Sequence, residues 1–301
     1  MKHFRYHGLE VYVLLMIQEG LNIFNLINDY LIARKLSNEF LIAWETYFNE
    51  AIWGWQLIKD DIQRLPPASR VLEIGAGPQV LTCKVSSQNV TVTAIEPFGQ
   101  GFSIMRELGN MVSVIAGEQD IKYDFIETNG ESFVKPQYFD FAYSINVMEH
   151  VDNVDLVLEN VISSLRYGGQ YHFVCPNYAF PFEPHFNSLT LLNKKLTDRF
   201  LKPRILRYSN NPEAEDLWNS LNWITVRGVK KWSKNRDDIS IKFSNRALLM
   251  YVSRSISDST FQNRHPKLSK FTRVFQKIIE ICARAIPNRF LPIIDVVITR
   301  F

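Results

Sequence analysis

Glycines and carboxylates lie at the ends of two neighbouring apolar segments, in a pattern typical of a nucleotide-like ligand site. The stretch VLEIGAGPQ places Glu73, Gly75 and Gly77 at the end of a strand-like run. Glycines there let the backbone turn tightly and approach a ligand, and the following helix offers free N–H groups. Glu96 ends the next run, VTVTAIE, where a carboxylate can accept both hydroxyls of a ribose. Any tight turn could use the glycines, and Glu96 could be a solvated loop acid, but together they predict a ribose site.

Two pairs of acidic and histidine side chains could exchange protons with a ligand. Glu149 and His150 follow the run FDFAYSI, and Glu183 and His185 lie in the segment NYAFPFEPHF. Ligands of open α/β sheets bind beyond the carboxyl ends of the strands, so both pairs are placed to reach one. The alternatives are structural. Glu149 and His150 could begin a helix, and the segment around Glu183 could pack as a lid.

An alternation of strands and helices must position these residues, and the apolar pattern predicts one. From Leu41 to Leu65, apolar residues recur every three or four positions, which predicts a helix that PPASR ends. Short β-rich runs then alternate with helix-like segments, an order that predicts a doubly wound α/β fold with a parallel sheet. The predicted strands span 70–75, 90–96, 112–117, 139–145 and 170–177, and the clearest helix spans 153–167.

The pattern beyond residue 177 is looser, and it sets the expected domain organisation. Residues 1–65 are expected to form an N-terminal helical cap, and 66–301 a single domain. Within that domain we expect a substrate lid over 178–222 and a helical insertion over 246–290. The remaining predicted elements are a loop at 178–187, helices at 188–208 and 226–235, and strands at 239–244 and 292–300.

Composition restricts the class of protein. The 301 residues are 46% hydrophobic, enough for a substantial core, and the net charge of +3 comes from 34 basic and 31 acidic residues. No concentrated basic face is predicted, so nucleic acid is not an expected partner. The three cysteines lack metal-like spacing and suit a reducing compartment.

Two apolar segments are considered for contact with a membrane, and two side chains, His172 and Cys175, for a structural role. VYVLLMI, at 11–17, is too short to span a bilayer and lacks a cleavage site, so we expect a helix and a cytoplasmic chain. The segment 268–286 has helical apolar spacing and could lie on a membrane, but packing on its own domain is preferred and no stable insertion is expected. His172 and Cys175 are interpreted as structural.

Three segments carry a family resemblance. VLEIGAG with Glu96 after the second strand, FDFAYSINVMEHV at 139–151 and LRYGGQYHFVCPN at 165–177 resemble, in order and spacing, the signature segments of class I S-adenosylmethionine-dependent methyltransferases. The resemblance covers about 66–180. Its MEHV and CPN endings are similar to the branch that contains the ubiquinone-pathway O-methyltransferases.

The resemblance implies a Rossmann-like fold, S-adenosyl-L-methionine as cofactor and a set of contacts to it. Glu73 and the backbone around Gly75 and Gly77 would hold the amino acid part of the cofactor, and Glu96 would hold the ribose. Glu118, in AGEQD after the predicted third strand, would lie near the adenine, with Asp120 as the competing choice. The backbone at Ser144 and Ile145 would line the methionine side.

The implied reaction is methyl transfer to a small organic acceptor at oxygen. His150 is the preferred base, and His185, Glu149 and Glu183 are further catalytic candidates. The family often has a third glycine where Gln79 stands, and this chain departs from the family pattern there.

Other functions are kept as alternatives. In the ubiquinone-pathway relatives a glutamate joins the EH pair in a metal site, but Asn146 stands there, so no metal is predicted. A catalytically silent cofactor-binding partner or sensor module is the alternative function. A nicotinamide oxidoreductase ranks third, because Val80 stands where its fingerprint needs glycine or alanine. Oligomeric state stays open.

Overall fold

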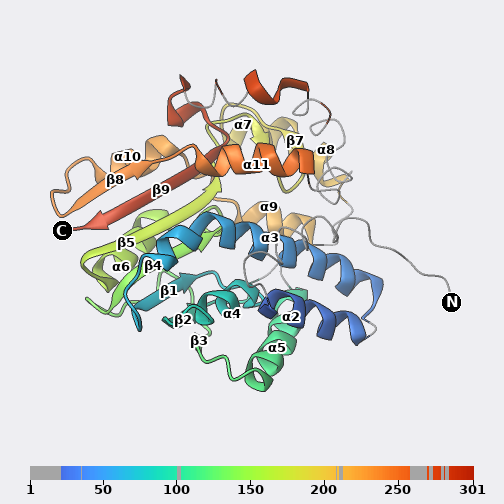
Figure 1. Cartoon of the computed structure of the whole chain (residues 1–301). Helices are drawn as coiled ribbons and strands as arrows, with labels where there is room; N and C mark the ends of the chain where they lie inside the picture. Colours follow the sequence, from blue (N-terminus) through green and yellow to red (C-terminus); the bar gives the residue numbers. More distant parts are fainter. Residues whose placement is uncertain are drawn as a thin grey trace.

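A seven-stranded sheet runs through the part of the chain that the structure describes, in the order β3-β2-β1-β4-β5-β9-β8. The structure, a computed structural model (Figure 1), describes residues 22–34, 36–99, 103–207, 209, 213–257, 270, 274–278, 281 and 285–301. The strands are β1 (Arg70–Ile74), β2 (Thr91–Ile95), β3 (Asp124–Ile126), β4 (Phe139–Ile145), β5 (Leu165–Pro176), β8 (Ile239–Phe243) and β9 (Ile293–Arg300). The first five pair in parallel, and β9 and β8 extend the sheet antiparallel. The predicted doubly wound α/β class is confirmed.

Helices cover both faces of this sheet because its central strands are apolar on both sides. One face packs on α2 (Asn22–Ala33), α3 (Asn38–Gln63), α4 (Val80–Ser86) and α5 (Ser103–Glu118). The other face packs on α6 (Val154–Ser164), α9 (Ala214–Ser220) and α10 (Val226–Ser233). The chain order of strands and helices therefore encloses two apolar cores, one on each side of the sheet.

The helix α3 confirms the predicted helix at 41–65, although it begins earlier. Ser37 caps its first turn by accepting a hydrogen bond from the Phe40 backbone N–H at 3.4 Å. The apolar stripe, which includes Trp44, Ile52 and Ile58, is buried against the core. Residues 1–21, with the predicted helix at 11–17, lie outside the described residues, so the cap over 1–65 stays a prediction.

The predicted strand at 112–117 is wrong. These residues form the last turns of α5, and the third strand is β3, further along the chain. Val112 and Ile115 have the β-branched side chains that favour strands, but with Leu108 they recur at helical spacing, and all three are buried. Burial of that stripe outweighs the local strand preference. The helix predicted at 153–167 also ends early, because β5 already begins at Leu165.

The segment after β5 forms a small hairpin and short helices. The predicted loop contains β6 (Phe182–Glu183), which pairs with β7 (Ser188–Leu189). The predicted helix at 188–208 is divided into α7 (Lys194–Phe200) and α8 (Lys202–Arg207). Further on lie α11 (Arg246–Ser257) and the 3₁₀ turn η1 (Asn288–Phe290). Parts of the expected insertion at 246–290 lie outside the described residues, namely 258–269, 271–273, 279–280 and 282–284, which include Cys282 and much of 268–286.

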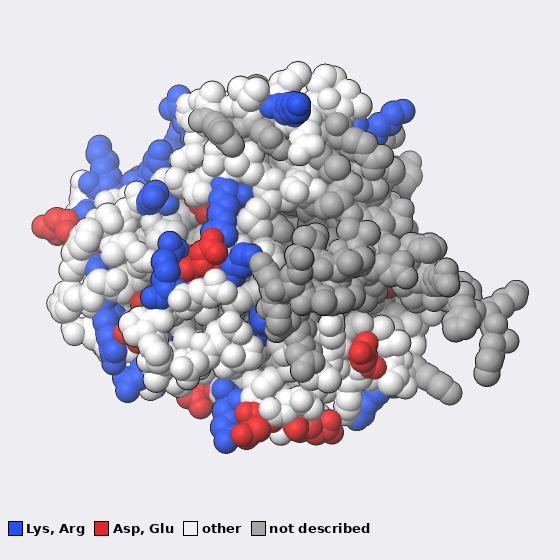
Figure 2. All heavy atoms as spheres, in the orientation of Figure 1, with Lys and Arg blue, Asp and Glu red and all other residues white. Residues whose placement is uncertain are grey.

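Two further observations concern the charges on the surface and the character of the helices. On the face drawn in Figure 2, basic side chains lie on several parts of the molecule and are interspersed with acidic ones. Within the described ranges, no helix combines the length and the apolar character needed to cross a bilayer.

His172 joins α3 to the sheet. It lies on β5, and its Nδ1 is 2.8 Å from Asp61 Oδ2 on α3, while its Nε2 is 3.1 Å from Asp295 Oδ1 on β9. Burial alone would lower the pKa of His172, but the two carboxylates raise it to about 9. The backbone N–H of Ala247, in α11, donates to the other oxygen of Asp295. This supports the structural interpretation of His172.

Candidate functional site

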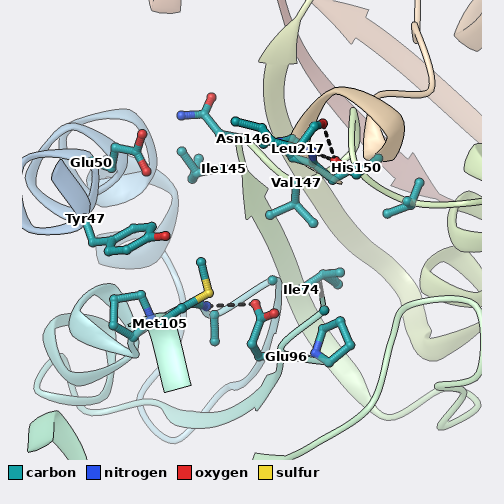
Figure 3. Close-up of a pocket in the computed structure, with 18 of the residues that line it drawn as sticks. Tyr47, Glu50, Ile74, Glu96, Met105, Ile145, Asn146, Val147, His150 and Leu217 are labelled. Carbon is teal, nitrogen blue, oxygen red and sulfur yellow. Dashed lines mark hydrogen bonds between the residues drawn. The ribbon is translucent and has the colours of Figure 1, made fainter. Parts of the chain in front are cut away.

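A cavity of about 1240 Å³ lies beyond the carboxyl ends of β1, β2, β3 and β4. It occupies the point where the strand order reverses between β1 and β4, the usual ligand position in open α/β sheets. Figure 3 shows Glu96 and Met105 on one side, with Asn146 and His150 opposite. The helix α3 borders the cavity through Tyr47, among other residues. Its volume exceeds the roughly 300–1,000 Å³ typical of a single small-molecule pocket, which leaves room for two ligands together.

The loop after β1 brings bare backbone to this cavity. Gly75 has a φ of +73°, and a Cβ added there would lie 2.7 Å from Val147 Cγ1 and closer still to Cγ2. Gly77 has a φ of +51°, but its added Cβ would meet only Met105, at 3.6 Å from the sulfur. Gly75 is therefore required by space and by backbone conformation, and Gly77 by conformation alone. Gln79, at the position of the missing glycine, also has a positive φ of 64° and precedes α4.

Glu73 is a buried residue near the end of β1, next to this loop. Its carboxyl is buried and accepts a hydrogen bond of 2.5 Å from Thr82 Oγ1, while it also lines the cavity. Burial raises its pKa to about 8. The side chain can therefore accept or donate a hydrogen bond near neutral pH, according to what lies beside it.

Glu96 is positioned by the backbone on either side of it. Its Oε2 accepts a hydrogen bond from Gly77 N, and its Oε1 accepts one from Phe98 N, each at 3.0 Å. Burial raises the pKa of Glu96, and the two N–H donors act against that rise. Glu96, the residue predicted to hold the ribose, therefore lines the cavity with both carboxylate oxygens held by backbone N–H groups.

The predicted place of Glu118 is wrong. Glu118 ends α5 instead of following a strand, and it does not line the cavity. Asp120 is exposed and lies 3.0 Å from Lys122 Nζ in an ion pair. The residues that follow the true third strand and do line the cavity are 128–131, in the sequence TNGE. Sequence reasoning missed them because β3 is three residues long and polar at its start.

Ser144 and Ile145, the two residues at the end of β4 that were predicted to line the methionine side, differ in their surroundings. Ile145 lines the cavity, whereas the Ser144 side chain is buried and its Oγ lies 2.8 Å from Tyr171 Oη. Asn146 also lines the cavity, with a φ of 55°, and its backbone N–H donates to Val174 O at 2.8 Å. This sharp turn directs the following residues across the cavity.

His150 borders the cavity in a defined tautomer. Its Nδ1 lies 2.8 Å from Ser220 Oγ, and that hydroxyl donates to Leu217 O at 2.8 Å. Because the hydroxyl proton is used there, Ser220 accepts from His150 Nδ1–H, which assigns the lone pair to Nε2. Burial, and then the charge of His185, hold the pKa of His150 well below its usual range. The ring is a neutral base at pH 7.

Glu183 and His185 meet His150 from the β6–β7 hairpin. His185 Nδ1 lies 2.6 Å from Glu183 Oε1, and the rings of His185 and His150 have centroids 5.0 Å apart. Tyr178 Oη and the Phe186 backbone N–H also donate to Glu183, at 3.1 and 2.7 Å. Burial would lower the pKa of His185, but the Glu183 carboxylate raises it to about 9. His185 is therefore cationic at pH 7, and His150 is neutral.

Glu149 completes this cluster. Its side chain is fully buried, neither carboxyl oxygen has a hydrogen-bond partner, and Oε1 lies 4.0 Å from His150 Nε2. Burial raises its pKa to about 8. One ligand atom from each of Glu149, His150 and His185 lies within 4.8 Å of the others, a set that could hold a metal ion. The sequence pointed to all three residues but not to their meeting.

A family model described as a methyltransferase domain matches residues 49–222. An uncharacterized protein of Mycobacterium tuberculosis is 34% identical over 253 residues, which cover 83% of this chain and 85% of that protein. A ubiquinone biosynthesis O-methyltransferase of Rickettsia typhi is 24% identical over 110 residues, 36% of this chain and 40% of that protein.

One solved structure illustrates the likeness of fold. The geranyl diphosphate C-methyltransferase of Streptomyces coelicolor A3(2), solved with Mg²⁺, geranyl diphosphate and S-adenosyl-L-homocysteine, matches with a TM-score of 0.50 at 12% identity. The match covers 86% of this chain and 82% of that one.

Proposed function

Because this chain belongs to the methyltransferase family, we propose that it transfers the methyl group of S-adenosylmethionine to a hydroxyl oxygen of a small organic acceptor. The observation that carries the oxygen assignment is the neutral His150, which lines the cavity and whose contact to Ser220 assigns the unprotonated nitrogen to Nε2. A hydroxyl acceptor must lose its proton during the transfer, and a neutral imidazole is suited to take it.

The reaction is an in-line displacement at the methyl carbon. A lone pair of the acceptor oxygen forms the new C–O bond, and the electron pair of the breaking C–S bond stays on sulfur, which gives S-adenosylhomocysteine. The proton of the acceptor passes to His150 Nε2. The chain contributes alignment of the two substrates and a base that is unprotonated at neutral pH.

The cofactor is proposed to lie over the loop after β1. Glu73 and the backbone at Gly75 and Gly77 would hold its amino acid part, and Glu96 its ribose hydroxyls. Ile145 would line the methionine side, and the backbone at 128–131 replaces Glu118 as the proposed neighbour of the adenine. The support is that all of these residues line one cavity.

Glu183 and His185 are proposed to act next to the base. The cationic His185 disfavours a second positive charge on His150, so it keeps His150 neutral until the acceptor proton arrives. Glu183 holds His185 in place by the 2.6 Å contact, and Glu149 Oε1 lies 4.0 Å from His150 Nε2. The hairpin that carries His185 belongs to the proposed substrate lid.

The test is product formation from a panel of hydroxyl acceptors, measured as release of S-adenosylhomocysteine. His150→Ala should lower turnover by roughly a hundredfold to ten-thousandfold with cofactor affinity nearly unchanged. His185→Ala should raise the Michaelis constant for the acceptor more than it lowers turnover. Full activity of His150→Ala would refute the assignment of the base.

Two alternatives have distinct outcomes. A cofactor-binding module without catalysis would bind S-adenosylhomocysteine but release none from S-adenosylmethionine with any acceptor. A metal on Glu149, His150 and His185 would occupy the histidine nitrogens, since Nδ1 of each ring is already paired and Nε2 would be the ligand. We expect activity to survive treatment with a chelator, because His150 acts as the base.

A further inference from the structure

Gln79 carries a side chain at a backbone position that favours glycine. Its φ of 64° lies in the left-handed region, which is unfavourable for residues with a Cβ. Its backbone also closes the turn after β1, because its N–H donates to Ala76 O at 2.9 Å and its O accepts from Cys83 N at 3.1 Å. The turn after β1 therefore depends on a residue in an unfavourable conformation, which its surroundings must hold.

A tyrosine from outside the turn holds the Gln79 side chain. Gln79 is buried, and its Oε1 accepts a hydrogen bond of 2.9 Å from Tyr123 Oη, just before β3. Burial, and then the neighbouring Cys83, raise the pKa of Tyr123, so its hydroxyl keeps its proton and acts as the donor. Removal of this donor would leave the Gln79 oxygen without its partner, which is costly for a buried side chain.

The helix α5 leaves space for the same side chain. Gly109 lies inside α5, where glycine is less favourable than alanine. A Cβ added there would lie 3.0 Å from Gln79 Nε2, 3.6 Å from Phe98 Cζ and 3.7 Å from Pro78 Cα. The Gln79 amide cannot move away freely, because its Oε1 is bound to Tyr123. The glycine inside α5 is therefore explained by the position of this amide.

The turn that Gln79 closes carries the contacts proposed for the cofactor. Gly77 N donates to Glu96 Oε2 at 3.0 Å, and Phe98 N donates to Glu96 Oε1 at the same distance. Gly77 stands shortly before Gln79 and lines the cavity together with Glu96. A shift of Gln79 would therefore move both the bare backbone of the turn and a donor that orients the Glu96 carboxylate.

We propose that Tyr123 and Gly109 are positioning residues for S-adenosylmethionine, although neither lines the cavity. Tyr123 binds the Gln79 amide and Gly109 leaves it room, and together they keep the turn after β1 in the conformation that receives the cofactor. This role rests on the proposed function, in which the cofactor lies over the turn. In a Gln79→Gly variant neither residue should be needed, because glycine adopts the left-handed conformation unaided.

Calorimetric titration with S-adenosylhomocysteine tests both residues. Tyr123→Phe and Gly109→Ala should each raise the dissociation constant roughly threefold to tenfold. The matched controls are Gly117→Ala, in the same helix with nothing within 4 Å of an added Cβ, and Tyr167→Phe, at an exposed tyrosine of β5. Both controls should leave the constant unchanged. A wild-type constant in Tyr123→Phe or in Gly109→Ala would overturn the proposal.

The Gln79→Gly background separates positioning from general stability. There, Tyr123→Phe and Gly109→Ala should each change the dissociation constant by less than about twofold. Urea unfolding of every variant ensures that affinity is compared between folded proteins. Equal losses of affinity with and without the Gln79 side chain would show that Tyr123 and Gly109 act on the fold as a whole, which would overturn the proposal.

Amide exchange in the cofactor-free protein decides the positioning role even if the proposed function fails. Gly77 N donates to Glu96 Oε2, and Gln79 N donates to Ala76 O. These two amides should exchange at least about threefold faster in Tyr123→Phe, while the amides of β4 keep their rates. If S-adenosylhomocysteine does not bind the wild type, the proposed function fails, and the exchange rates decide whether Tyr123 holds the turn. Unchanged rates at Gly77 and Gln79 would overturn the proposal.

Discussion

Alanine at Gly75 should damage the protein far more than alanine at Gly77, although both glycines have a positive φ. A left-handed conformation costs a residue with a Cβ roughly 1–2 kcal/mol, so Gly77→Ala should lose about that much stability. Its new methyl group reaches Met105 only at ordinary contact distance, 3.6 Å from the sulfur. Gly75→Ala bears the same backbone cost and also meets Val147 Cβ at 3.0 Å and Cγ1 at 2.7 Å. Overpacking of this kind adds about 1–3 kcal/mol, for a total of about 2–5 kcal/mol.

Val147→Ala provides the internal control, because it removes the two methyl groups that the new Cβ would meet. Urea unfolding of the wild type, the single variants and the double variant gives a coupling free energy. We expect Val147→Ala to restore about 1–3 kcal/mol of unfolding free energy to the Gly75→Ala variant and none to the Gly77→Ala variant. Calorimetric titration with S-adenosylhomocysteine on the folded variants shows whether the loop still binds.

The reasoning would be refuted by equal losses of stability for the two glycine variants, or by a Val147→Ala change that is simply additive with Gly75→Ala. Either result would mean that the loop after β1 relaxes away from Val147 at little cost. The contact would then not determine which residue occupies position 75.

Three further predictions concern other parts of the chain. Glu96→Ala should weaken S-adenosylhomocysteine binding by roughly tenfold to a hundredfold in calorimetry, whereas Glu118→Ala should not change it. Arg300→Met removes a guanidinium nitrogen that donates to the carbonyls of Ile162, Ser163 and Leu165, and should cost on the order of 2 kcal/mol in urea unfolding. The pKa of His172 is raised to about 9 in the folded protein, so protonation of its ring stabilises the fold. That stabilisation is complete below the unfolded-state pKa near 6.5 and is lost as the pH rises towards 9. His172→Gln should therefore flatten the dependence of unfolding free energy on pH over that interval.

The strands of the parallel sheet could be predicted where a short apolar run stands alone between turn signals. The run at 139–145 matches β4, and the runs at 70–75 and 90–96 match β1 and β2 within one residue. The run at 112–117 failed because its neighbours upstream extend the same apolar residues at helical spacing. A strand pattern and the end of an amphipathic helix look alike over six residues, and only burial of the whole stripe decides between them.

The candidate site was predictable residue by residue but not as an arrangement. Glu149 and His150 follow a strand end, and His185 lies in an aromatic loop, so each was singled out by local pattern. Their meeting depends on how the β6–β7 hairpin folds back over β4, which no local pattern encodes. The hydrogen bond from His150 to Ser220 on α9, which fixes the tautomer, belongs to the same long-range packing.

The helix α3 also connects stability to the proposed acceptor site. Asp61, near the end of α3, is paired with His172, while Glu50 and Tyr47 of the same helix line the cavity. At about 1.5 Å per residue, Asp61 lies some 17 Å along the helix from Glu50, so the contact to the sheet orients the cavity-lining part of α3 from a distance. The proposed cofactor contacts come from the loops of the sheet itself, and we expect them not to depend on the pairing of Asp61 with His172. His172→Gln should therefore raise the Michaelis constant for the acceptor and leave the dissociation constant of S-adenosylhomocysteine unchanged. A parallel loss of cofactor affinity would show that α3 and the loops after the strands behave as one unit, and the positions of Tyr47 and Glu50 would then depend on the whole core.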